Sequence, residues 1–163
     1  MVTSSGQRRW LVALMALILG AVALPARAQS SIRFSGGASI DPEQAYAGVA
    51  WESPDIGGRF RLRPGIDGGF GSGLRMGAIN IDLVVRFPIG QTGWSLVQGG
   101  GPTITITTLS GDYAEGSPKD LHAGGSYLFG FAHDSGFFTE FRIGGGGYVP
   151  GLKIGAGWSV KIQ

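Results

Sequence analysis

Hydrophobic and polar positions alternate along most of the chain after its first 28 residues. The clearest case is the segment 152–162, in which every even position is apolar or small and every odd position is Lys, Gly or Ser. Because successive side chains of a strand point to opposite faces, this segment has one apolar and one polar face. The same period of two returns in segment after segment and predicts strands. No segment after residue 28 has the three-and-four spacing of an amphipathic helix.

Eight such strands are predicted, separated by stretches rich in Gly, Pro, Asp and Ser, which favour tight reversals of the chain. The strands span residues 32–40, 45–52, 59–70, 75–87, 93–108, 121–132, 137–145 and 152–162. Neighbours joined by short links pair as an antiparallel meander. Eight strands also close into a barrel whose interior is filled by side chains. The sequence therefore predicts an all-β fold, an eight-stranded antiparallel up-and-down barrel.

The first 28 residues have the pattern of a cleavable secretory signal. Arg8 and Arg9 form a positive start, residues 10–24 carry no charge, and Ala26-Arg27-Ala28 is a small-x-small cleavage site. The uncharged stretch is shorter than the roughly 20 apolar residues that a transmembrane helix needs. The paired arginines also allow the twin-arginine route, but the flanking residues of that motif are missing, which favours general export. We expect a signal peptide over residues 1–28 and one domain over residues 29–163.

The direction of the apolar face decides between a transmembrane barrel and a soluble, lipocalin-like one. Charged residues make up only 15% of the chain, against about 25% in an ordinary soluble domain. The polar face carries small side chains, such as Thr103, Thr105 and Thr107, which fit a narrow lumen. Aromatic residues on the apolar face lie beside turns, as in the girdle of a membrane barrel. These aromatic residues are Trp51, Phe60, Phe87, Trp94, Phe131 and Phe137. We therefore expect a transmembrane barrel, with a soluble periplasmic barrel for a small apolar ligand as the alternative.

Twelve charged residues within the strands fall on the polar face, which is the lumen face of a membrane barrel. They are Arg33, Glu52, Arg59, Arg61, Arg63, Asp67, Asp82, Arg86, Glu140, Arg142, Lys153 and Lys161. Charges in a lumen must be paired or hydrated. Hairpin pairing predicts contacts of Glu52 with Arg59 and of Arg63 with Asp82. We interpret the set as a structural ionic plug rather than an anion-selective pore or binding site, since eight strands leave room for side chains and not for a channel.

Three groups of short motifs point to a known class of protein. They are Arg86-Phe87-Pro88 with Gly93-Trp94, the run Gly99-Gly100-Gly101-Pro102, and Gly136-Phe137-Phe138-Thr139-Glu140 leading into residues 152–157. With these motifs the chain resembles small bacterial outer-membrane β-barrels of the OmpA/OmpX type, and bacterial proteins of unknown function with an outer-membrane β-barrel domain. Such proteins usually end on an aromatic residue, whereas this chain ends with Ile162-Gln163, which lowers the expected strength of the assembly signal.

The resemblance implies an outer-membrane location and a structural or surface-interaction role. An even strand count then puts both chain ends in the periplasm and makes residues 110–120 the longest exposed loop. The expected partners are outer-membrane lipid, lipopolysaccharide and the barrel-assembly machinery, and we expect a monomer.

Outer-membrane lipid A deacylases, which are similar in size, use a His-x-Ser pair with a Glu. The nearest match is His133-Asp134-Ser135 with Glu140, but the Asn that follows the Ser in that family is Gly136 here. If residues 132 and 137 pair, Glu140 lies opposite Phe129, seven residues from His122, the other histidine. At about 3.3 Å per residue this separation is roughly 23 Å, far beyond hydrogen-bond reach. We therefore assign no catalytic residue and expect no enzyme activity.

Composition argues against several other classes of function. Without Arg8, Arg9 and Arg27, 10 basic residues remain of 13, against 11 acidic ones, so the domain gives no basis for binding nucleic acid. With no Cys and two His, no metal site is expected. The glycine runs lack the helix and the Lys-Ser/Thr of a phosphate loop, so no cofactor is expected either.

Overall fold

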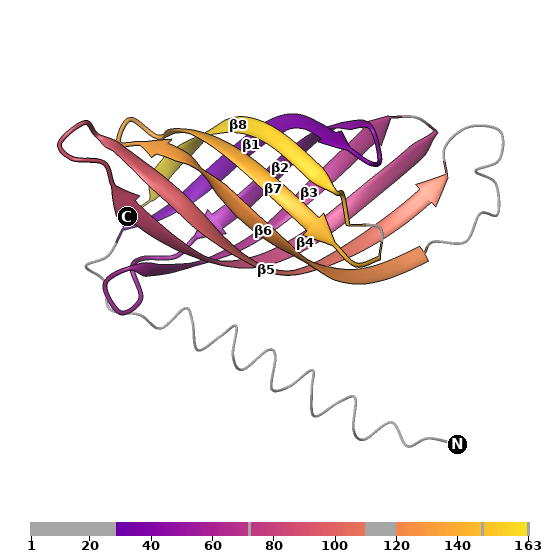
Figure 1. Ribbon diagram of the computed structural model, residues 1–163, viewed down its shortest axis with the longest axis horizontal. Coiled ribbons are helices and arrows are strands. Elements are labelled where there is room, and N and C mark those ends of the chain that lie inside the picture. The colour runs from indigo at the N-terminus through magenta and orange to yellow at the C-terminus, as the bar shows by residue number, and fades with distance from the viewer. Residues whose placement is uncertain (1–28, 72, 110–119, 148, 163) are drawn as a thin grey trace, which may run out of the picture.

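The computed structural model describes residues 29–71, 73–109, 120–147 and 149–162. Within these ranges the chain forms eight antiparallel strands that follow one another around a closed barrel (Figure 1). The strands are β1 (Ser30–Ile40), β2 (Gln44–Glu52), β3 (Phe60–Gly71), β4 (Leu74–Pro88), β5 (Trp94–Leu109), β6 (Asp120–His133), β7 (Phe137–Gly145) and β8 (Leu152–Ile162). Each predicted strand is present, with both of its boundaries within two residues. The predicted fold is therefore confirmed.

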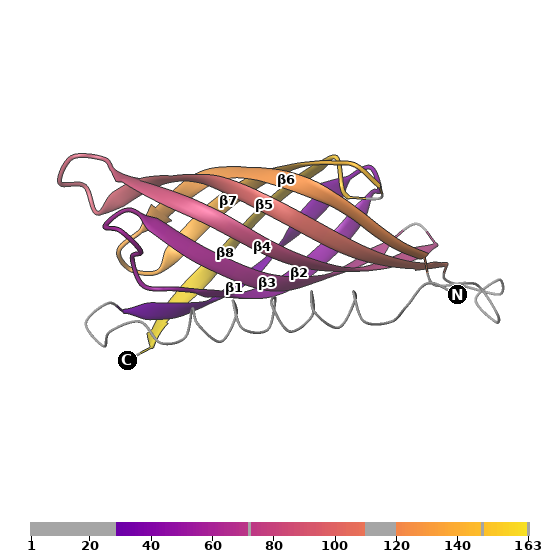
Figure 2. The same ribbon diagram turned by 90° about the horizontal axis from the view of Figure 1, so that it is seen from below.

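The two ends of the barrel carry different parts of the chain. The end called here the terminal end carries Gln29, Ile162 and the turns 53–59, 89–93 and 134–136 (Figures 1 and 2). The opposite end, called the loop end, carries the links from β1 to β2, β3 to β4, β5 to β6 and β7 to β8. An even number of antiparallel strands returns the chain to its starting side, so both described chain ends lie together.

Pairing of β1 with β8 closes the sheet. The register runs without interruption from Ser30 opposite Ile162 to Ile40 opposite Leu152. All other pairs join strands that are consecutive in the chain. Closure satisfies the backbone groups that an open sheet would leave at its two edges. The closed barrel is therefore compatible with an apolar environment, which offers no hydrogen-bond partners to the backbone.

Burial shows which face of the strands points inward. Among the described residues, fourteen polar or charged side chains are buried against eight hydrophobic ones, the reverse of a water-soluble protein. Large hydrophobic side chains are exposed around the outside, among them Phe34, Ile66 and Trp158 at 50–57%. Such an exterior is typical of a barrel surrounded by lipid. A lipocalin-like barrel requires the opposite arrangement, with an apolar interior.

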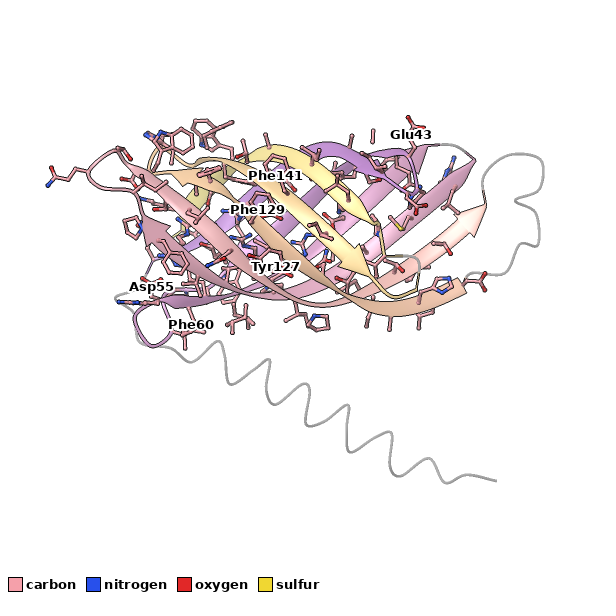
Figure 3. All side chains as sticks on the ribbon, viewed as in Figure 1. Glu43, Asp55, Phe60, Tyr127, Phe129 and Phe141 are labelled. Atoms are coloured by element: carbon pink, nitrogen blue, oxygen red, sulfur yellow. The ribbon has the colours of Figure 1, made fainter. Side chains whose placement is uncertain are left out.

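Figure 3 shows the side chains that project from the barrel wall. Phe129 of β6 stacks on Phe141 of β7, with ring centres 5.0 Å apart. Phe60 and Tyr127 are about half exposed. No helix of the described residues is long and apolar enough to cross a membrane. The predicted signal peptide over 1–28 and most of the predicted loop 110–120 lie outside the described residues and stay predictions.

Candidate functional site

Glu52 is the centre of the largest ion-pair cluster inside the barrel. It is the last residue of β2, and its side chain is fully buried. Its Oε1 accepts hydrogen bonds from Arg61 Nη1 at 3.0 Å and Arg86 Nη2 at 2.6 Å. Its Oε2 accepts from Arg63 Nε at 3.0 Å and Nη2 at 2.7 Å, and Arg33 Nη1 lies 3.6 Å away. One carboxylate is thus shared by four guanidinium groups, which come from β1, β3 and β4.

A second cluster crosses the lumen between β7 and β4. Arg142 donates two parallel hydrogen bonds to Asp82, Nη1 to Oδ1 at 3.0 Å and Nη2 to Oδ2 at 2.7 Å. Glu140 accepts from Arg142 Nη2 at 3.1 Å and from Arg63 Nη1 at 2.7 Å. Since Arg63 also binds Glu52, the first two clusters form one continuous network. Such two-pronged, charge-assisted contacts are among the strongest that side chains make.

A third cluster lies nearer the loop end. Lys153 Nζ is 2.9 Å from Asp67 Oδ2, and Asn80 donates to the same oxygen at 2.7 Å. Thr103 donates to Asn80 Oδ1 at 2.9 Å. The ammonium group of Lys153 also lies 4.1 Å from the centre of the Tyr46 ring, a cation–π contact. Charge and hydrogen-bonding capacity are thus matched at this level of the lumen too.

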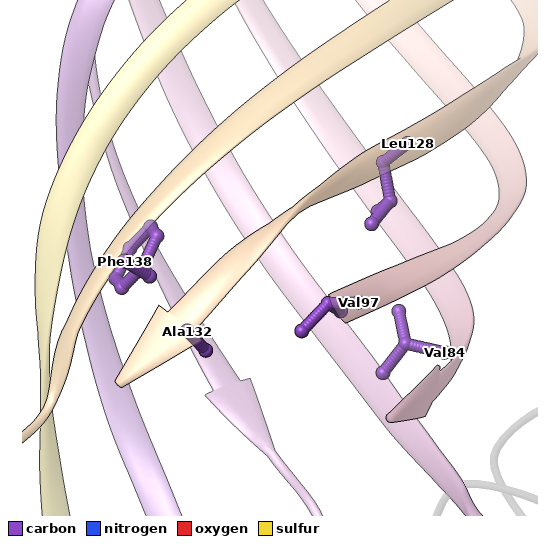
Figure 4. Packing of buried hydrophobic residues seen from close by; sticks show 5 residues of the cluster. All are labelled: Val84, Val97, Leu128, Ala132 and Phe138. Atoms are coloured by element: carbon purple, nitrogen blue, oxygen red, sulfur yellow. The ribbon is translucent and has the colours of Figure 1, made fainter. Parts of the chain in front are cut away.

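An apolar cluster fills the β4–β7 side of the lumen (Figure 4). It consists of Val84, Val97, Leu128, Ala132 and Phe138, each at most 5% exposed. The guanidinium carbon of Arg33 lies over the ring of Phe138, 3.6 Å from the ring centre. The interior therefore combines an ionic side with an apolar side.

The apolar cluster was not predicted, because the inner face was expected to hold small and charged residues. The sequence does contain a signal for it. Val84-Val85 and Leu128-Phe129 are pairs of successive apolar residues within strands. Because neighbours point to opposite faces, one member of each pair must lie inside. Val84 and Leu128 are those members, and neither is exposed.

Little free space remains in the middle of the lumen. The cavity there has a volume of about 40 Å³ and is bounded by Arg33, Arg63, Glu140 and Arg142, among others. It has room for a few water molecules, whereas small-molecule sites usually measure about 300–1,000 Å³. A small apolar ligand, as in the lipocalin-like alternative, does not fit this space.

Ten of the twelve predicted lumen charges lie in the three ionic clusters, and two do not. Arg59 is exposed in the turn before β3, which begins at Phe60, so the predicted contact of Glu52 with Arg59 is wrong. The turn extends over residues 53–59, and Glu52 therefore meets Arg61 instead. Lys161 is exposed at the open terminal end of the barrel.

The predicted ion pair between Arg63 and Asp82 is also wrong. The two residues are directly opposite in the β3–β4 register, as predicted. Their charges nevertheless pair elsewhere, Arg63 with Glu52 and Glu140, and Asp82 with Arg142. Long side chains in a narrow closed lumen reach the facing wall, so the position along the barrel axis decides the pairing. Hairpin register describes neighbours in the sheet and contains no information about the facing wall.

The six predicted interfacial aromatics are Trp51, Phe60, Phe87, Trp94, Phe131 and Phe137, and they flank the three turns of the terminal end. At this rim the ring of Phe137 lies 6.3 Å from that of Trp94 and 6.2 Å from that of Trp158, which the prediction omitted. The ring of His133 lies 4.9 Å from that of Trp94. The predicted set thus describes one rim of the barrel, because all three turns used to find it belong to the same end.

His133 and Ser135 form a hydrogen bond of 2.9 Å in an exposed turn. Glu140 takes no part in this contact. Glu140 binds the arginines of the lumen, whereas the His133 ring packs on Trp94 at the rim. The register assumed for this hairpin was off by one: Ala132 pairs with Phe138, and Glu140 faces Gly130 rather than Phe129. Directly opposed residues share a face, and Ala132 and Phe138 both point inward. The arrangement offers no His–Ser–Glu relay.

The barrel as a whole is similar to solved crystal structures. The crystal structure of the N-terminal β-barrel domain of Pseudomonas aeruginosa OprF superposes with a TM-score of 0.61 at 10% identity, covering 85% of this chain and all of that one. The crystal structure of Neisserial surface protein A (NspA) gives 0.59 at 12% identity, covering 82% of this chain and 95% of the other. The chain has the fold of the OmpA/OmpX-type outer-membrane barrels. No family model and no curated protein sequence matches it.

Proposed function

We propose that this protein is a non-conducting outer-membrane barrel with a structural or surface-interaction role and without catalytic activity. The observation that carries the proposal is the filled lumen beneath an apolar exterior. The network of Glu52, Arg63 and Arg142 spans the interior, the apolar cluster fills its other side, and a cavity of about 40 Å³ remains between them. A continuous water-filled path for ions requires far more space than this.

The membrane location is supported by the apolar outer face and by the barrel fold. Large hydrophobic side chains are exposed on every strand except β2, which is unfavourable in water and favourable in lipid. In the proposed orientation both chain ends and the terminal end face the periplasm, and the loop end faces the cell exterior. Lipid, lipopolysaccharide and the barrel-assembly machinery are the proposed partners of a monomeric barrel.

Planar-bilayer recording tests the proposed lack of conduction. We expect the purified protein, folded in detergent and migrating heat-modifiably on gels, to give no discrete channel openings when it is added to a bilayer. A large porin reconstituted in parallel shows that insertion is detectable, because barrels of 16–18 strands leave an aqueous channel. Discrete openings of the intact barrel would contradict the proposed plug.

Fractionation of cells tests the location independently of conduction. The full chain should sediment with the outer membrane and require detergent for release. Recovery in the soluble periplasmic fraction without detergent would contradict the membrane proposal. A strain lacking the gene should then be tested for sensitivity to detergent and large antibiotics, which a structural role in the envelope predicts.

A further inference from the structure

We infer that the open terminal end of the barrel is a binding site for a small phosphate-bearing anion. A cavity of about 400 Å³ opens there, above the filled part of the lumen. A second hollow of about 510 Å³ adjoins it and shares Arg61 and Arg86 as lining residues. These volumes lie within the range of small-molecule sites. The proposed structural role does not require such a hollow.

The charge at this end is strongly unbalanced. The two hollows are lined by five basic residues, Arg33, Arg59, Arg61, Arg86 and Lys161, and by two acidic ones, Asp55 and Asp134. Glu52 lies beneath them and binds Arg61 and Arg86. The lining therefore keeps an excess of positive charge, even when Glu52 and the 3.7 Å contact of Arg33 with Glu140 are counted. A phosphate monoester carries between one and two negative charges at neutral pH, so it would reduce this excess.

Several hydrogen-bond donors at this end are unused by the protein. A guanidinium group has five N–H donors. Among the described residues, Arg86 makes one hydrogen bond, to Glu52, and Arg61 makes two, to Glu52 and Asp55. Arg59 and Lys161 make no hydrogen bond or ion pair with any described residue. The site therefore has both the charge and the spare donors that an oxyanion requires.

Arg33 forms the floor of the site, and its unused donor is a further indication of an anion there. Arg33 is 4% exposed, and its Nη1 has no hydrogen-bond acceptor within the described part of the chain, although Glu52 lies within ion-pair distance. Buried donors of this kind are rare and are usually explained by a missing partner. The Nε of Arg86 is buried and without an acceptor in the same way. Both groups contact the same carboxylate, so one small anion could approach both.

Calorimetric titration tests this inference with the folded domain of residues 29–163 in a zwitterionic detergent. Glycerol 3-phosphate is the probe, and glycerol is the uncharged control. We expect saturable binding of the phosphate alone, weakened by added salt because the contacts are partly exposed. Binding in detergent depends neither on cellular location nor on conduction, so its failure leaves the proposed function intact. Absence of saturable binding would overturn the inference.

Three variants separate a defined site from general attraction of anions. Lys161→Gln and Arg59→Gln each remove a lining charge without touching the ionic clusters, so the barrel should stay folded. Each should weaken binding roughly two- to five-fold. Arg75→Gln removes the same charge from an exposed position on β4 at the loop end and should leave the affinity unchanged. Equal weakening by Arg75→Gln and Lys161→Gln would overturn the inference.

The phosphate group could come from a free metabolite or from a lipid headgroup, and competition distinguishes the two sources. Mixed micelles containing phosphatidylglycerol that displace glycerol 3-phosphate, where micelles containing phosphatidylcholine do not, would assign the site to an anionic headgroup. Undiminished binding of glycerol 3-phosphate in the presence of either lipid would assign it to a free molecule.

Discussion

At the scale of single residues, the lumen is organised by arginines that reach across it. Asp82 and Arg142 are 60 positions apart in the sequence, yet they form a two-pronged pair. Burial of each charge is costly unless a partner compensates it. The barrel can therefore hold charged side chains in its interior only because they are paired. Removing one partner of a pair should lower the stability of the barrel more than removing both.

A double-mutant cycle tests the pairing of Asp82. Asp82→Asn should lower the free energy of unfolding by about 3–5 kcal/mol, reduced by whatever water reaches the lumen. Combining it with Arg142→Gln should recover part of the loss, a coupling of about 0.5–3 kcal/mol. The measurement is urea unfolding followed by heat-modifiable migration on gels.

Arg63→Gln is the matched control for that cycle, because Arg63 is opposite Asp82 in the sheet but binds Glu52 and Glu140. Its coupling with Asp82→Asn should be clearly smaller. A larger coupling with Arg63 than with Arg142 would mean that register rather than reach decides the ion pairs.

The sequence identified ten charged residues that lie inside the barrel but not which of them would meet. Alternation in the strands is a local property, and it placed Arg63, Asp82 and Arg142 on one face. The partners depend on how the sheet curls, which brings β7 to face β3 and β4 across the lumen. The missed apolar cluster has a local cause instead, because the double apolar positions at Val84-Val85 and Leu128-Phe129 already interrupt the alternation.

At the scale of strands, the period of two and the turn residues were sufficient to predict all eight elements. The exceptions are at turns. Arg59 was assigned to a strand that begins one residue later, and the β6–β7 register was off by one. Gly136 explains the second case: its φ of +103° allows a tight reversal, closed by its N–H donating to the His133 carbonyl at 2.9 Å. Turn geometry of this kind is not contained in strand alternation.

Two glycines in the barrel wall, Gly157 of β8 and Gly77 of β4, have different surroundings, which predicts different effects of an added methyl group. A Cβ at Gly157 would meet the Phe34 carbonyl oxygen and the Phe138 ring, whereas a Cβ at Gly77 on the outer face of β4 would meet nothing within 4 Å. Gly157→Ala should cost about 1–3 kcal/mol of stability through overpacking. Gly77→Ala should be neutral or slightly stabilising. Equal unfolding midpoints of the two variants in urea would show that the lumen is looser than described.

At the scale of the whole molecule, the two ends differ in chemistry as well as in chain connection. The terminal end carries the chain termini, the aromatic rim and the basic hollow, and the filled lumen separates it from the loop end. If the barrel spans the outer membrane as proposed, the two ends face different compartments. A small anion at the terminal end would then be bound from the periplasm and would not cross.

Cysteine labelling tests this orientation, and the absence of native Cys makes it unambiguous. Glu43→Cys lies in an exposed link at the loop end, and Gln91→Cys lies in an exposed turn at the terminal end. A membrane-impermeant maleimide on intact cells should label the first, and should label the second only after permeabilisation. The reverse pattern would mean that the barrel is inserted the other way round.

β1 is the first of the eight strands to be synthesised, yet its second partner, β8, is the last. Until residue 162 exists, β1 keeps one row of backbone donors and acceptors without a strand to bind. Joining chain segments so distant in sequence is entropically costly and slow. The ion pairs between β7 and β4 likewise wait for most of the chain. A chain that lacks β7 and β8 thus has no seam and lacks the ion pairs across the lumen, so closure of the barrel is a late event that requires all eight strands.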